Sequence, residues 1–425
     1  MHEFTQLPNG LRIITHTMNE TESVTVNFFV GAGGRYEDMQ TEYGVSHFLE
    51  HLLFKGTTRR PTAKQISEEI DSVGGYLNAY TTEDHTSYYI KLPKNYFGLA
   101  FNILADVITD PILEQIEIDR ERDVILEEMK LFKDDPARNV YDFVGDLLWP
   151  HDNLRTNIIG TEHIISTMER QTIKDYFDNM YTVSNIVVSV AGNISHQQVV
   201  DMAQKQLFDV QLNTPRTWQP VLGELSKQRV SIEKQETNQT HLVLAGRAPR
   251  IDASDESTMK LLCTILGSGS GSSSRLYLNV RENKGLAYSI YMSYSNFVDC
   301  GKFEIYAGVN TDKVEEAITA IQEELLKIQQ EEVSLRELNK AKEQVRGQYI
   351  MGLEGNAAVA DMQGTQLILS GKVDTLPQIL DKIDAVTAED IQRAAQAYLY
   401  KDLVRLAIIG PHDTDQIDTF SKLLI

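Results

Sequence analysis

The two halves of this 425-residue chain follow the same course of strands and helices. Each half has an apolar strand, helices, a long alternating strand pair, further helices, and a closing apolar strand that stops at glycine. The closing strands are residues 185–192 and 404–411, and amphipathic helices at residues 172–181 and 388–398 precede them. Because a repeated order of elements indicates a repeated unit, we expect two structurally homologous domains rather than one continuous core.

The length of the chain supports the same division, since a single hydrophobic core rarely organises this many residues. The join is expected where Pro215, Pro220 and Gly223 interrupt any periodicity. We predict an α+β fold of two tandem homologous domains, each an antiparallel-rich sheet packed with helices. Their predicted bounds are residues 1–212 and 229–425, with a linker at residues 213–228.

Composition limits the cellular compartments in which we expect to find the protein. Hydrophobic residues make up 42% of the chain and charged residues 24%, which is ordinary for a globular protein in water. No stretch approaches the roughly 18 consecutive apolar residues that span a bilayer, so no membrane insertion is expected. The amino terminus lacks the pattern of a signal peptide. The two cysteines, Cys263 and Cys300, are too few for a disulfide framework. We therefore expect a cytoplasmic protein.

The net charge of −21 comes from 61 acidic and 40 basic residues. It argues against nucleic-acid binding, because a nucleic-acid site needs a basic surface that replaces counterions. Acidic walls around a cleft would attract cationic peptide segments. The same charge can also serve solubility alone, and the sequence leaves both interpretations open.

The stretch from His47 to His51, with the sequence His-Phe-Leu-Glu-His, carries the densest chemical signal. Residues four apart share one face of a helix, so both imidazoles can bind one metal ion. Glu50 lies beside them and could take a proton from a water at that metal. The flanking residues are apolar and Gly56 can end the helix. The motif is the zinc-protease pattern HExxH in reverse order, H-x-x-E-H.

Two imidazoles do not complete a catalytic zinc site, which needs a third protein ligand. The charged helix predicted at residues 114–132 offers Glu121, Glu127 and Glu128. Glu121 and Glu128 are seven residues apart and so lie on one helical face. Glu127 points about 100° away from Glu128 and is expected to face solvent. Periodicity does not choose the ligand among these acids, and a solvated acidic face is the alternative.

Together these motifs closely resemble the pitrilysin family of zinc peptidases, peptidase family M16, whose H-x-x-E-H members are the inverzincins. The resemblance is to the short, processing-peptidase-like bacterial type, M16B, and to its tandem α/β-roll fold, as in the mitochondrial processing peptidases. The stretches that carry it are residues 47–57, 74–81, 83–89 and 121–128.

The resemblance implies a site with one Zn²⁺ per chain. Its ligands would be His47, His51 and the family's glutamate 77 positions beyond the second histidine, which is Glu128 in this sequence. Glu50 would be the general base. Glu121 would match the family's acid near the metal, which orients a ligand imidazole or holds charge there.

The strand that contains Asn78, Ala79 and Tyr80 follows a glycine pair and alternates apolar with polar side chains. On its own it indicates an ordinary hairpin strand. In the resembled family the matching strand is an exposed edge to which the substrate adds as an extra strand. The resemblance therefore implies that these three residues bind substrate.

The second half contains no H-x-x-E-H motif, but it has two features of its own. A loop with Gly269 and Gly271 lacks the ending of a phosphate-binding loop and resembles the family's glycine-rich loop, which positions peptide. Arg281 and Tyr288, without the resemblance, indicate a charge at a helix end and a core aromatic residue. The resemblance instead implies that Arg281 binds a substrate carbonyl and Tyr288 stabilises the oxyanion, after closure of the two domains.

These features predict a zinc-dependent endopeptidase that hydrolyses unfolded peptides, or leader or targeting segments. We expect a homodimer, because one chain carries both the zinc motif and the glycine-rich loop, which family heterodimers divide between subunits. A heterodimer with a homologous subunit is the alternative. A second alternative is a non-catalytic peptide-binding or scaffold subunit, although such family members usually have broken zinc motifs.

Overall fold

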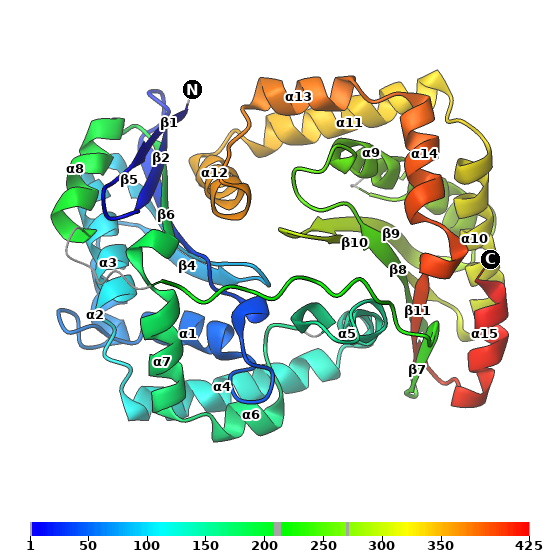
Figure 1. The fold of residues 1–425 in the computed structure, drawn as a ribbon, viewed down its shortest axis with the longest axis horizontal. Coiled ribbons are helices and arrows are strands. Elements are labelled where there is room, and N and C mark those ends of the chain that lie inside the picture. The colour runs from blue at the N-terminus through cyan, green and yellow to red at the C-terminus, as the bar shows by residue number, and fades with distance from the viewer. Residues whose placement is uncertain (1, 156, 208–213, 269–271, 425) are drawn as a thin grey trace. The chain divides into compact units, whose positions relative to one another are not determined.

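The computed structural model describes residues 2–155, 157–207, 214–268 and 272–424 (Figure 1). The chain forms two compact units, each with one sheet. Unit 1 consists of Met1–Lys130, Asn157–Gln219 and Ile350–Thr375, and unit 2 consists of Leu131–Thr156, Pro220–Tyr349 and Leu376–Ile425.

The sheet of unit 1 has the strand order β1-β2-β6-β3-β5-β4. The strands are β1 (His2–Gln6), β2 (Arg12–Thr17), β3 (Ser23–Val30), β4 (Tyr76–Thr81), β5 (Thr86–Pro93) and β6 (Ile186–Gly192). Only the β2–β6 pair is parallel. Every residue of β6 is buried, as is β3 from its second residue onward. Central strands covered on both faces are expected to be mostly apolar, as these sequences are apart from buried polar residues such as Asn27 and Ser189.

The sheet of unit 2 has the order β7-β11-β8-β10-β9. The strands are β7 (Val230–Lys234), β8 (Thr240–Ala248), β9 (Ala287–Asn296), β10 (Gly301–Val309) and β11 (Arg405–Gly410). They take the places of β2, β3, β4, β5 and β6, and the one parallel pair, β7–β11, corresponds to β2–β6. The predicted duplication of an α+β unit is confirmed by this shared strand order.

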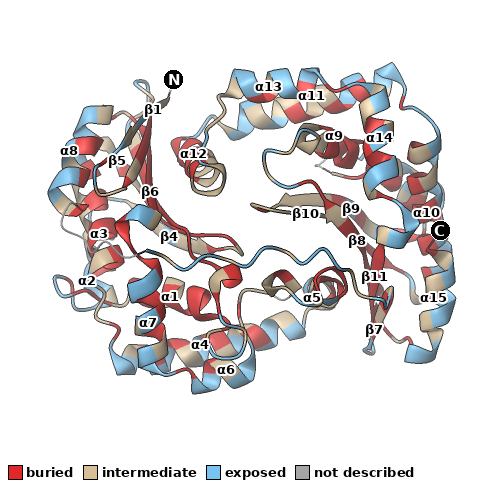
Figure 2. Ribbon diagram, in the orientation of Figure 1, coloured by how far each residue is buried: buried red, intermediate tan, exposed pale blue. Residues whose placement is uncertain are grey.

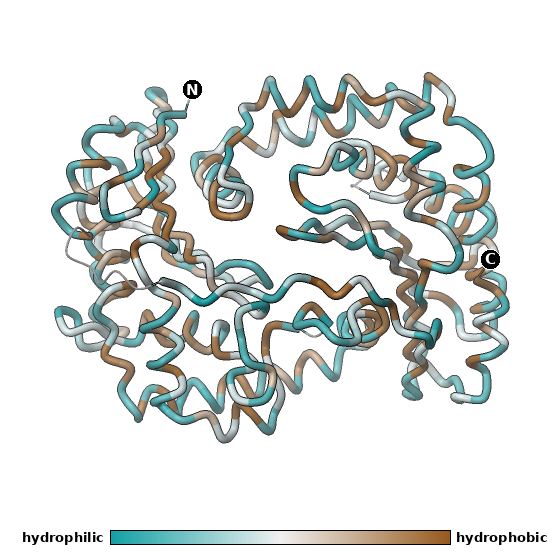
Figure 3. Tube along the Cα trace, viewed as in Figure 1, coloured by the Kyte–Doolittle hydropathy of each residue, from teal (hydrophilic) through white to brown (hydrophobic). Residues whose placement is uncertain are grey.

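Each unit also contains its own set of helices. In unit 1 they are α1 (Val45–Leu53), α2 (Ala63–Asp71), α3 (Phe97–Thr109), α4 (Gln115–Lys133), α6 (Glu162–Thr167), α7 (Arg170–Met180), α8 (His196–Leu207) and α12 (Asn356–Ser370). In unit 2 they are α5 (Pro136–Leu148), α9 (Glu256–Leu266), α10 (Val314–Gln330), α11 (Leu335–Gly352), α13 (Leu376–Asp384), α14 (Ala388–Tyr398) and α15 (Ile417–Leu423). Figures 2 and 3 show that buried, apolar residues gather in the strands and on the sheet-facing sides of the helices.

Two helices pack on the sheet of the opposite half of the sequence. Helix α5 comes from the first half but packs on β8 and β11 of unit 2. Helix α12 comes from the second half but packs on β3 and β6 of unit 1, beside β6 in Figure 1. Leu367 of α12 joins a buried apolar cluster with Phe29 and Val187. A Cβ atom at Gly364 would lie 1.9 Å from a Phe29 ring carbon, so glycine permits this close packing.

The compact units therefore depart from the predicted bounds of residues 1–212 and 229–425. Each predicted domain gives one helix to the other unit, and residues 220–228 of the predicted linker belong to unit 2. Val221 and Leu225, for example, pack on the apolar cluster of α5, β8 and β11. The periodicity of a helix shows which of its faces is apolar, but it does not show which of two similar sheets that face covers. Within the described ranges, no helix is long and apolar enough to cross a membrane.

Candidate metal centre

Helix α1 holds the H-x-x-E-H motif in a fixed orientation. At its N-terminus, the buried carboxylate of Glu37 accepts hydrogen bonds from the backbone N–H groups of Gly44 and Ser46, each with a nitrogen–oxygen distance of 2.8 Å. These bonds satisfy amides that the first turn of a helix leaves without intrahelical partners. Burial, only partly offset by these bonds, raises the pKa of Glu37 to about 7. The apolar residues of α1 are buried, and the predicted helix at the motif is confirmed.

Helices α1 and α4 bring His47, His51 and Glu128 together. The Nε2 atom of His47 lies 3.7 Å from Oε2 of Glu128, and Nε2 of His51 lies 3.8 Å from the same oxygen. One donor atom from each residue falls within 4.8 Å of the others. No other group of three or more such side chains is found in the parts of the chain that the structure describes.

The chemistry of this donor set fits Zn²⁺. Two imidazole nitrogens and one carboxylate oxygen are ligands that zinc takes in catalytic sites, at about 2.0–2.2 Å from the metal. Tetrahedral ligands at that radius lie roughly 3.4 Å apart, so the two histidine–glutamate separations need only a small contraction. Burial, and then the neighbouring His51, lower the pKa of His47 to about 3. The His47 imidazole is therefore neutral near neutral pH, which is the form that binds metal.

Glu121 lies on the other side of the His51 ring. Its Oε2 atom is 3.1 Å from Nδ1 of His51, and its Oε1 atom is 2.7 Å from Nζ of Lys55. Burial alone would raise the pKa of Glu121, but hydrogen bonds and charges from His51 and Lys55 hold it below its ordinary value. An ionised Glu121 fixes the His51 tautomer with Nδ1 protonated, which leaves Nε2 free for a metal.

The three acids of α4 that the sequence offered are thus separated by geometry. Glu128 shares the donor group with the two histidines, whereas Glu121 contacts Nδ1 of His51 and Nζ of Lys55. Glu127 is exposed and lies 2.7 Å from Lys130 on the same helix. The solvent-facing prediction for Glu127 is confirmed.

Glu50 points toward the end of strand β4. Its Oε2 atom accepts a hydrogen bond of 2.7 Å from the hydroxyl of Thr81. Burial raises the pKa of the Glu50 carboxyl, and the bond from Thr81 partly opposes that rise. Nothing in the sequence pattern singled out Thr81, because a single polar residue at a strand end has many possible partners. Its contact with the motif is seen only in the fold.

Strand β4 is the terminal strand of its sheet and pairs with β5 on one side. Asn78 is exposed, and Ala79 follows it along this edge. The hydroxyl of Tyr80 donates to Oδ1 of Asp361 on α12 at 2.6 Å, so this side chain turns toward the helix. His85 is buried near Tyr80 and is not part of the metal-binding group.

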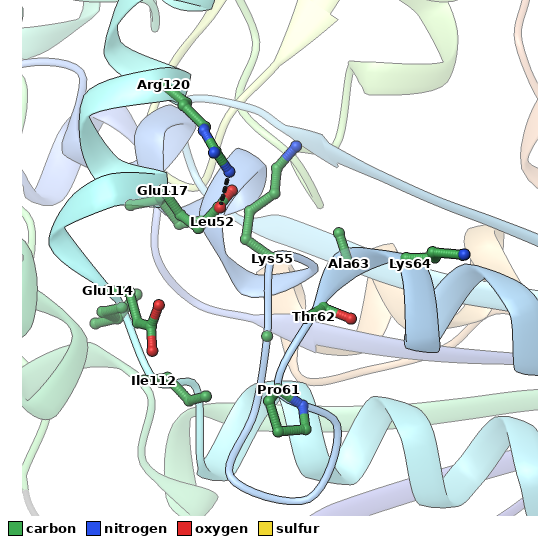
Figure 4. Close-up of a pocket in the computed structure, with 12 residues that line it drawn as sticks. Leu52, Lys55, Pro61, Thr62, Ala63, Lys64, Ile112, Glu114, Glu117 and Arg120 are labelled. Atoms are coloured by element: carbon green, nitrogen blue, oxygen red, sulfur yellow. Dashed lines mark hydrogen bonds and ion pairs between the residues drawn. The ribbon is translucent and has the colours of Figure 1, made fainter.

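A cavity of about 280 Å³ lies beside the centre, between the end of α1 and the start of α4. Figure 4 shows Lys55 at its wall, together with the ion pair between Glu117 and Arg120. None of the three donor residues lines this cavity.

Arg281 and Tyr288 are neighbours in unit 2. Arg281 lies in a π-helical turn, Tyr277–Asn283. Its guanidinium is 4.9 Å from the centre of the Tyr277 ring and 5.7 Å from that of Tyr288. Tyr288 is 74% exposed. The interpretation of Tyr288 as a core aromatic residue is therefore wrong, and its hydroxyl is accessible. Gly269 and Gly271 lie outside the described residues.

Comparison with known proteins places the chain among peptidases. Residues 12–162 match the family model described as insulinase (peptidase family M16), and residues 167–345 match the model described as peptidase M16 inactive domain. A structure of a protease from Helicobacter pylori superimposes with a TM-score of 0.90, at 23% identity over 97% of this chain and 99% of that chain, so it has the same fold.

Several relatives match along almost the whole sequence. A relative from Bacillus subtilis that is named an uncharacterized zinc protease is 31% identical over 95% of this chain and 97% of its own length. One from Rickettsia felis is 34% identical over 96% of this chain and 97% of its own. A probable mitochondrial-processing peptidase β subunit of Arabidopsis thaliana is 30% identical over 96% of this chain and 78% of its own. The chain therefore belongs to peptidase family M16, in its short, processing-peptidase-like form.

Proposed function

We propose that this protein is a zinc-dependent endopeptidase that hydrolyses unfolded peptides, or leader or targeting segments. The observation that carries the proposal is the convergence of His47, His51 and Glu128 from two helices, with the carboxylate of Glu50 on the same turn. The names of the B. subtilis and R. felis relatives, both zinc proteases, support it.

The chain's own residues supply positioning and proton transfer. Zinc, when bound by the three donors, polarises a carbonyl and lowers the pKa of a water to about 7. Glu50 takes a proton from the attacking water and delivers it to the leaving amine. The raised pKa of Glu50 favours the first transfer, because a more basic carboxylate takes up a proton more readily.

The edge strand β4 is the proposed binding surface for the peptide backbone. A peptide that adds to the free edge at Asn78, Ala79 and Tyr80 gains main-chain hydrogen bonds that depend little on its sequence. This mode suits an extended, unfolded substrate. The net charge of −21 further favours basic segments, by attraction at long range.

Arg281 and Tyr288 are the proposed contributors from unit 2. The exposed hydroxyl of Tyr288 can donate to an oxyanion, and the Arg281 guanidinium can bind a substrate carbonyl.

We also propose that two copies of this chain form the working enzyme, because one chain carries every feature invoked above. Light scattering after size-exclusion chromatography should give about twice the chain mass of 48.0 kDa. A monomer that gains activity only on adding a homologous subunit would instead indicate a heterodimer.

The description of one matching model as an inactive domain does not favour a non-catalytic role. That match covers residues 167–345, whereas the donors lie at His47, His51 and Glu128, within the other match.

The test is the Glu50→Gln variant, which removes the base and retains size and polarity. Zinc content should stay at one ion per chain, and peptide cleavage should fall by about 10²- to 10⁴-fold, the usual contribution of a general base. Glu127→Gln is the matched control, because that carboxylate is 71% exposed and turned away from the donors. Cleavage by Glu50→Gln at the wild-type rate would refute the proposed mechanism.

A further inference from the structure

Helices α5 and α12 are equivalent elements of the two repeats, and each covers the sheet of the unit it joins. Tyr141 and Asp361 hold the same place in them, five residues after the first residue of each helix. Each of these side chains meets a tyrosine hydroxyl on the terminal strand of the sheet below. Asp361 accepts from Tyr80 on β4 at 2.6 Å, and the hydroxyls of Tyr141 and Tyr291 on β9 lie 2.9 Å apart.

In unit 1 this contact fixes the end of β4 from one face. Tyr80 and Thr81 are adjacent, so their side chains point to opposite faces of the strand. Tyr80 is bound to Asp361 on α12, whereas Thr81 is bound to Glu50 on α1. The end of β4 therefore lies between α12 and α1, the helix that carries the H-x-x-E-H motif.

Burying the Tyr80–Asp361 pair costs more free energy than burying apolar side chains of similar size. Asp361 is half-buried on α12, and the two residues before it in the sequence, Val359 and Ala360, are buried and apolar. Burial raises the pKa of its carboxyl, and the bond from Tyr80 only partly opposes the rise. Apolar residues of similar size often stabilise such a position better than a buried charge. What the directional bond adds is a defined position for the strand.

We propose that Asp361 is a positioning residue for substrate binding, which holds β4 in place to receive an extended peptide. The inference rests on the proposed function, because it takes β4 as the edge to which the peptide adds. A strand that is already fixed loses little conformational freedom when a peptide pairs with it, so binding is tighter. Loosening the strand should weaken binding of long peptides, with no effect on the metal donors.

The test measures the affinity of a fluorescent, extended peptide for zinc-loaded protein in the Glu50→Gln background, where turnover is absent. Asp361→Leu removes the acceptor with little change in volume and should raise Kd about tenfold, the loss expected for one hydrogen bond to a charged group. Asp361→Asn keeps an oxygen acceptor and should fall between Asp361→Leu and the parent. Zinc content should be equal in all variants.

Tyr141→Phe is the matched control, because it removes the equivalent hydroxyl from the unit without the donor group. It should leave peptide Kd and zinc content unchanged. A Kd for Asp361→Leu equal to that of the parent would overturn the inference, as would an equal rise in Tyr141→Phe or a loss of zinc. A peptide that binds and responds to Asp361→Leu, but is not cleaved when Glu50 is present, would refute the peptidase and leave the inference standing. Absence of peptide binding to the parent would overturn both.

Discussion

Replacing Glu121 by Gln tests how the ligand His51 is oriented. The carboxylate is almost fully buried and divides its two oxygens between Nδ1 of His51, at 3.1 Å, and Nζ of Lys55, at 2.7 Å. The variant keeps the shape but removes the charge that favours a protonated Nδ1 and a free Nε2. It also leaves the Lys55 ammonium without its anionic partner at that position.

Loss of a partner that orients a metal-binding histidine typically lowers metal affinity by about 10- to 100-fold, or roughly 1.4–2.7 kcal/mol. We expect the zinc affinity of Glu121→Gln to fall within this range. The assay is competition for zinc against a chromophoric chelator at fixed pH. Glu127→Gln provides the baseline, because Glu127 is on the same helix and faces away. Equal zinc affinity in Glu121→Gln and the wild type would refute the orienting role of Glu121.

Three other changes test separate parts of the structure. Thr81→Val removes the hydroxyl that donates to Glu50, so kcat should fall about tenfold at constant zinc content. Thr81→Ser keeps a hydroxyl and should retain activity. An unchanged kcat in Thr81→Val would show that this hydrogen bond does not contribute to catalysis. Gly364→Ala forces a methyl group against Phe29, so urea unfolding should show a loss of about 1–3 kcal/mol, and a fully stable variant would contradict the packing. The pKa of Glu37 is raised from its ordinary value of 4.5 to about 7. Between pH 4.5 and about pH 7, the folded state therefore keeps a proton on Glu37 that the unfolded state has released. The contribution of Glu37 to the free energy of unfolding is therefore fully present below pH 4.5. It falls as the pH rises from 4.5 to about 7, by up to ~1.4 kcal/mol per pH unit. The free energy of unfolding of Glu37→Gln, measured in urea, should not fall with pH in this way. The same fall with pH in Glu37→Gln and the wild type would refute the role of Glu37.

Local patterns in the sequence predicted most of the elements. The closing strands expected at residues 185–192 and 404–411 lie where β6 and β11 are found, and the helices expected at residues 172–181 and 388–398 are α7 and α14. Thr62 and Gln65, three residues apart in the sequence, form a capping box at the start of α2. Such features depend on residues within one or two turns of each other, so a single sequence carries the information.

Contacts between distant segments had no such signal. The bond from Tyr80 to Asp361 joins residues 281 apart in the sequence, and no periodicity relates them. For the same reason the exchange of α5 and α12 was not predicted, because each helix has an apolar face that suits either sheet. Long-range pairing is decided by the packing of the whole fold.

The choice among the acids of α4 shows the same limit at the metal centre. Glu121 and Glu128 lie two turns apart on one face, so periodicity treats them alike. In the fold, the His51 ring lies between them, with Nδ1 facing Glu121 and Nε2 facing Glu128. The two carboxylates therefore have different tasks, and the orientation of one imidazole distinguishes them.

The central claim is that one zinc ion is bound by two residues of α1 and one residue of α4. A crystal structure of the zinc-loaded protein with anomalous data at the zinc edge tests it most directly. We predict a single strong anomalous peak per chain, within about 2.0–2.2 Å of Nε2 of His47, Nε2 of His51 and a carboxylate oxygen of Glu128. A zinc peak bound elsewhere, or a Glu128 side chain that stays outside the coordination sphere, would contradict this arrangement.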